Sequence, residues 1–105
     1  MSKTPTVDFY DSIVSILTPT LKMKAHIESL RFEQKLYDLC IEYYKNKIKE
    51  QEKIISEQSS EQIVESCKLY VKEFDIKIME YQTKKSMCEI RITRQEMDLK
   101  NYKEF

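Results

Sequence analysis

The chain has 105 residues, 18 basic against 18 acidic groups, no glycine, no tryptophan and two prolines. This length predicts one domain with a thin core. Without glycine the chain lacks phosphate-binding glycine loops and most tight β-hairpin turns. Zero net charge provides no domain-wide attraction for nucleic acid or anionic lipid. The high charged fraction with so few helix breakers is typical of long helices, so we predict an all-α fold.

The first twenty residues are predicted to hold a flexible tail at 1–5 and a short helix at 7–17. Thr18 is expected to cap a second helix that begins at Pro19. Proline suits the first position of a helix because its missing N–H would have no partner there. The lack of a basic-then-apolar plan at the start argues against a signal peptide.

From residue 23 onward the apolar residues recur at alternating steps of three and four, which is the pattern of a coiled-coil seam. The pattern predicts long helices at 19–55 and 63–103. The seam positions of the first are Met23, Ile27, Leu30, Gln34, Tyr37, Ile41, Tyr44, Ile48, Gln51 and Ile55, and those of the second are Val64, Cys67, Val71, Phe74, Ile78, Tyr81, Lys85, Cys88, Ile92, Gln95, Leu99 and Tyr102.

The polar stretch SEQSSEQ, residues 56–62, separates the two seams. The step from Ile55 to Val64 breaks the seven-residue phase, so a continuous helix would have to turn its seam around the axis. Ser59 and Gln62 have the spacing of a capping box. The absence of a helix-ending glycine or asparagine counts against a turn. We predict a turn and therefore a long antiparallel hairpin; one continuous helix is the alternative.

A hairpin in which both seams end together would place Gln34 opposite Cys88 and Leu30 opposite Ile92. A register shifted by one heptad, with Gln34 opposite Tyr81, is the alternative. Polar residues within a seam lower stability and can fix register or oligomer state. We therefore interpret Gln34 and Lys85 as residues that specify the register.

Each long helix carries a further row of apolar residues away from its seam, and a helix that is apolar on two sides is expected to be buried on two sides. We name these the first outer row (Phe32, Leu36, Leu39 and Tyr43) and the second outer row (Ile76, Met79, Met87, Ile90 and Met97). The short helix at 7–17 spans only about 16 Å and could cover part of them. We expect a partner, either another copy or a different protein, to cover the rest in a multi-helix bundle. The residues predicted to contact it are Phe32, Leu36, Leu39, Tyr43, Ile76, Met79, Met87 and Ile90.

Catalytic, metal and cofactor sites are not expected. His26 is the only histidine and has no recognisable metal-ligand spacing. The sequence contains no phosphate-binding loop and no hydrolase or metalloprotease motif. Carboxylates such as Glu96 are expected to pair with a lysine four residues later, here Lys100. Three cysteines without CxxC spacing favour a reducing compartment, cytoplasmic or nuclear.

These features favour a non-catalytic assembly subunit that acts through helix–helix contacts. A first alternative is a small RNA- or ribosome-associated protein that uses a basic patch of Lys84, Arg91 and Arg94. The neutral charge balance and the excess of lysine over arginine disfavour nucleic acid as the partner. A second alternative is a regulator that masks a helix-binding groove on a partner. No apolar run approaches the length of a membrane span.

Overall fold

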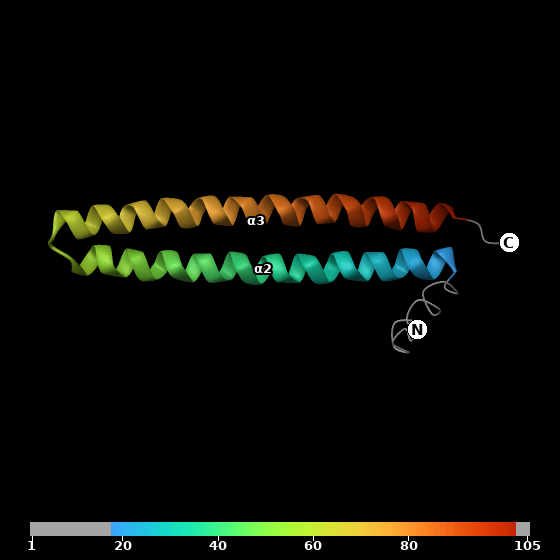
Figure 1. Cartoon of the computed structure of the whole chain (residues 1–105), viewed down its shortest axis with the longest axis horizontal. Helices are drawn as coiled ribbons and strands as arrows, with labels where there is room; N and C mark the ends of the chain where they lie inside the picture. The colour runs from blue at the N-terminus through green and yellow to red at the C-terminus, as the bar shows by residue number, and fades with distance from the viewer. Residues whose placement is uncertain (1–17, 103–105) are drawn as a thin grey trace, which may run out of the picture.

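The computed structural model describes residues 18–102, which form two long helices in an antiparallel hairpin (Figure 1). Helix α2 spans Pro19–Glu57 and helix α3 spans Glu61–Asn101. The two helices lie side by side along their whole length, and the connection between them lies at one end of the rod. The all-α fold and the hairpin are therefore confirmed. The predicted tail at 1–5 and short helix at 7–17 lie outside the described residues.

Helix α2 begins with the cap that the sequence predicts. The Thr18 hydroxyl accepts a hydrogen bond from the Leu21 N–H at 3.3 Å, and the Thr18 carbonyl accepts one from the Lys22 N–H at 3.0 Å. Thr18 has an extended backbone, with φ −65° and ψ 155°, and Pro19 follows at the first helical position. The cap thus satisfies N–H groups that have no partner within the helix.

The chain reverses direction across residues 58–60, within the predicted polar stretch, which excludes one continuous helix. Gln58 (φ −97°, ψ 138°) and Ser60 (φ −77°, ψ 119°) both have extended backbones. No residue in 18–102 has a positive φ angle. Two extended residues thus end one helix and start the next without a left-handed residue, so glycine is not needed.

The cap of α3 differs from the expectation. Helix α3 begins at Glu61, so its cap is Ser60 and not Ser59, and the Ser60 side chain makes no capping hydrogen bond. The predicted capping box is therefore wrong. The Ser60 carbonyl accepts from the Val64 N–H at 3.1 Å, which closes the first turn through the backbone alone.

The core of the hairpin is the predicted seam. Every buried side chain among the described residues occupies a seam position, and the other seam positions are half-buried except Tyr102. Tyr102 follows the last residue of α3 and is exposed. The buried side chains are Ile27, Leu30, Ile41, Cys67, Ile78, Cys88 and Ile92.

Contacts between the helices show which register the hairpin adopts. Ile27 and Leu30 of α2 form one buried cluster with Cys88 and Ile92 of α3. This is the register in which both seams end together. The alternative register would move Gln34 a full heptad, about 10 Å, away from Cys88 and Glu89, so its 2.8 Å hydrogen bond to Glu89 excludes that register.

Candidate functional site

The two outer rows are exposed along the hairpin. The eight residues predicted to contact a partner are each between 44% and 67% exposed. Phe32 and Leu39 on α2, and Ile76 and Ile90 on α3, lie five positions after a seam residue, on the side of each helix that faces away from the other helix. The first and second outer rows therefore line opposite long edges of the hairpin. Neither row is covered by any described residue.

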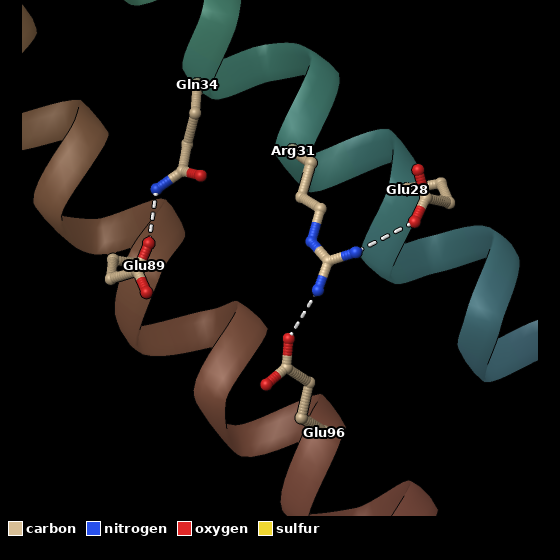
Figure 2. Close-up of polar contacts among 5 residues, drawn as sticks. All are labelled: Glu28, Arg31, Gln34, Glu89 and Glu96. Carbon is tan, nitrogen blue, oxygen red and sulfur yellow. Dashed lines mark hydrogen bonds and ion pairs between the residues drawn. The ribbon is translucent and has the colours of Figure 1, made fainter.

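Polar contacts cross the seam near the middle of the rod. The Gln34 side-chain amide donates to the Glu89 carboxylate at 2.8 Å (Figure 2) and to the Lys85 carbonyl at 3.4 Å. The Lys85 ammonium lies 2.7 Å from the Asp38 carboxylate of α2. Lys85 thus keeps its aliphatic part in the seam while its charge reaches the edge. Gln34 and Lys85 thus each bind a group on the opposite helix, as residues that specify a register would.

Arg31 forms a second polar bridge, which the sequence did not predict. Its guanidinium donates to Glu28 on the same helix at 3.0 Å and to Glu96 on α3 at 2.7 Å (Figure 2). The expected pairing of Glu96 with Lys100 is therefore wrong. Arg31 and Glu96 both flank the seam, where side chains of opposite charge can meet across two helices. That heptad position was the signal available in the sequence.

A small hydrogen-bonded group lies beside the seam around Glu33. The Tyr37 hydroxyl donates to the Glu33 carboxylate at 2.7 Å, and the Cys88 thiol lies 3.5 Å from its other oxygen. These hydrogen bonds, that of Tyr37 first, hold the pKa of Glu33 below its usual value. The same bond raises the pKa of Tyr37 to about 12. Burial, followed by the contact with Glu33, raises the pKa of the Cys88 thiol. All three groups therefore favour the protonation states they hold at neutral pH.

Aromatic side chains fill the middle of the seam. The ring centroids of Tyr37 and Tyr81 lie 6.0 Å apart, as do those of Tyr44 and Tyr81, and Tyr44 lies 5.8 Å from Phe74. These separations are typical of favourable aromatic pairs. The four rings pack against one another and so contribute to holding the helices together.

The predicted basic patch lies along one flank of α3. The Lys84 ammonium lies 5.2 Å from the centre of the Tyr81 ring, a cation–π contact. Arg91 is close enough to Glu33 for its charge to help lower the pKa of that carboxyl group. Arg94 is exposed. Two of the three cations thus have partners within the hairpin.

His26 and the three cysteines are further side chains that could react or bind a metal. His26 is exposed, and the structure shows no group of three potential metal ligands within residues 18–102. Cys67 and Cys88 are buried and Cys40 is half-buried, and all three thiols are free. Neither α2 nor α3 contains a segment apolar and long enough to span a bilayer.

We compared the chain with models of known protein families, with curated proteins and with solved structures, and none of them matches it. Within residues 18–102, the two outer rows are apolar surface that the packing of α2 against α3 does not bury.

Proposed function

We propose that the protein is a non-catalytic assembly subunit that binds its partner through helix–helix contacts. The observation that supports this proposal is the exposure of both outer rows, whose eight predicted contact residues are each at least 44% exposed. Complete burial of a large apolar side chain is favourable by about 1.5–3 kcal/mol. A partner that covers even one row would therefore recover a large part of the free energy that a small domain has available.

The residue types in the outer rows suit such a role. Met79 and Met87 are flexible and polarizable, so they can adapt to the shape of a partner. Phe32 and Tyr43 offer large rigid surfaces of the kind that dominates binding energy at interfaces. The partner is either a second copy of this chain or another helical protein.

A double substitution tests the proposal. Leu36→Glu with Met87→Glu adds one charge to each outer row, and we expect assembly to be lost while helicity is retained. Size-exclusion chromatography with light scattering measures assembly, and circular dichroism measures helicity. The matched control, Ser56→Glu with Gln82→Glu, adds the same two charges at exposed polar positions and should assemble normally. A Leu36/Met87 variant that assembles like the wild-type chain would show that these rows are not the interface.

We also propose that the protein resides in a reducing compartment, cytoplasmic or nuclear. Supporting this, none of its three cysteines is paired with another, and two are buried as small apolar side chains. Rapid alkylation of lysed cells, followed by mass spectrometry, would report these thiols as reduced. Recovery of the protein with oxidised, disulfide-linked cysteines would contradict this assignment.

A further inference from the structure

The second outer row continues one heptad before Ile76, to Leu69. Leu69 is 59% exposed and lies one heptad before Ile76, and Met97 is equally exposed and lies one heptad after Ile90. Thr83 occupies the heptad position between them. The row from Leu69 to Met97 therefore covers four heptad steps, or about 42 Å of helix.

The exposed apolar residues of this row are arranged symmetrically about Thr83. In sequence, each one before Thr83 has an apolar counterpart at the same separation after it. The pairs are Leu69 with Met97, Ile76 with Ile90, and Met79 with Met87.

We propose that α3 packs antiparallel against α3 of a second copy, with a two-fold axis at Thr83. The inference rests on the proposed assembly function and names the partner. In a two-fold interface both copies use the same surface. A residue a given number of positions before the axis therefore faces the residue the same number of positions after it in the second copy. The symmetry about Thr83 meets this requirement for the exposed apolar residues, because Leu69 then faces Met97, Ile76 faces Ile90 and Met79 faces Met87 of the second copy. A different protein would impose no such symmetry on the sequence.

Charges beside the row fit the same arrangement. Glu73 and Arg94 lie on the same flank of the row, and the two-fold axis brings Glu73 opposite the second copy's Arg94, twice in each dimer. Neither side chain has a hydrogen bond or an ion pair with any described residue. On the other flank, Glu65 meets the second copy's Lys100. Complementary charge at these flanking positions is what selects orientation in helix pairs.

Thr83 suits the centre of this interface. Its hydroxyl donates to the Met79 carbonyl at 3.0 Å, so it would not lose a hydrogen bond on burial. Its small side chain also allows two helices to approach closely. The first outer row covers only Phe32 to Tyr43, about 16 Å of helix, and it would remain exposed on the outer edges of the dimer.

Cysteine crosslinking tests the two-fold axis. In the proposed dimer the two copies of residue 83 lie face to face, whereas the two copies of residue 93 lie about 30 Å apart. We expect mild oxidation to link Thr83→Cys into a dimer rapidly and to leave the control, Thr93→Cys, unlinked. The wild-type chain reports the background from its native thiols. Equal linking of both variants, as a parallel pair would give, or linking of neither, would overturn the proposal.

Charge reversal tests the flanking pair in the reduced full chain. Glu73→Arg alone or Arg94→Glu alone places like charges opposite each other twice, and we expect each to raise the dimer dissociation constant by roughly tenfold. The double variant restores opposite charges and should return to within about threefold of wild type. Analytical ultracentrifugation measures the constants.

The possible failures can be told apart. A dimer whose affinity ignores all three charge variants would overturn the α3 pairing, while assembly through another face would still stand. A wild-type chain that stays monomeric at hundreds of micromolar would overturn self-pairing. In that case the Leu36/Met87 variant, tested on complexes captured from the source cells, decides whether the assembly function also fails.

Discussion

Ile90 and Ile92 are the same residue type, two positions apart on one helix, yet they have opposite surroundings. Ile92 is 4% exposed in the seam, and Ile90 is 55% exposed on the outer edge. Two helical positions rotate a side chain by about 200°, so the two isoleucines point in nearly opposite directions. The seam and the outer edge therefore differ in what covers them and not in their chemistry. The seam has its partner within the hairpin, whereas no described residue covers the outer edge.

The largest expected effect is a difference in stability between alanine substitutions at these two isoleucines. Ile92→Ala should lower the free energy of unfolding by about 2–4 kcal/mol because it opens a cavity in the buried cluster. Ile90→Ala should change it by less than about 0.5 kcal/mol in the monomer, where the side chain is already exposed. Urea unfolding at low micromolar concentration, followed by circular dichroism, measures both. Equal losses would mean that the outer edge is already covered within one chain.

Replacing a polar seam residue with an apolar one is expected to raise the free energy of unfolding, whereas Ile92→Ala lowers it. Gln34→Leu makes the seam continuous and is expected to raise the free energy of unfolding by about 1 kcal/mol, since a polar residue at such a position lowers stability. It also removes the bond to Glu89 that favours the observed register. We expect a second register to become populated, seen as doubled amide resonances in NMR spectra. A single set of resonances would show that Gln34 does not specify the register.

The hydrogen-bonded group at Glu33 predicts a dependence on pH. The pKa of Glu33 is lowered in the folded chain, so its contribution to stability is complete above about pH 4.5 and is lost as pH falls further. The pKa of Tyr37 is raised to about 12, so its contribution is complete below about pH 10 and is lost as pH rises toward 12. Tyr37→Phe removes the shared bond, and its melting temperature should vary less than wild type in both ranges. Parallel wild-type and variant curves would contradict this role.

The smallest effect is expected for the bridge at Arg31. Its guanidinium and the Glu96 carboxylate are about half exposed, so water and salt screen their attraction. Arg31→Ala should therefore lower the free energy of unfolding by less than about 1 kcal/mol, and by less still in 1 M salt. Lys49→Ala removes an exposed cation of α2 that has no hydrogen bond or ion pair with any described residue, and it serves as the control. A loss that salt leaves unchanged would point to packing by the arginine stem instead.

The parts of the fold that follow from side-chain period were predictable from sequence. The three-and-four spacing identified Ile27, Cys67 and Ile92 as core, and the break in phase after Ile55 identified the reversal. The spacing also placed Phe32 and Ile90 away from the seam, where the structure finds them exposed.

Contacts that depend on the relative position of two helices were not predictable. Glu96 has a lysine within reach on its own helix, yet it pairs with Arg31 because the register brings that guanidinium to 2.7 Å. The residue that caps α3 likewise depends on the backbone path of the turn. Ser59 and Ser60 are the same residue type, so the sequence does not decide between them.

The turn at residues 58–60 lies at the opposite end of the rod from the buried cluster of Ile27, Leu30, Cys88 and Ile92 (Figure 1). A short connection favours closing of the nearest seam layers first, since their loops are smallest. Folding would thus proceed like a zipper from the turn, and the tightest contacts would form last. Tension on the free ends of the two helices would reach those contacts once the outer layer of Met23 and Leu99 had opened. We therefore expect the hairpin to resist separation most near its open end.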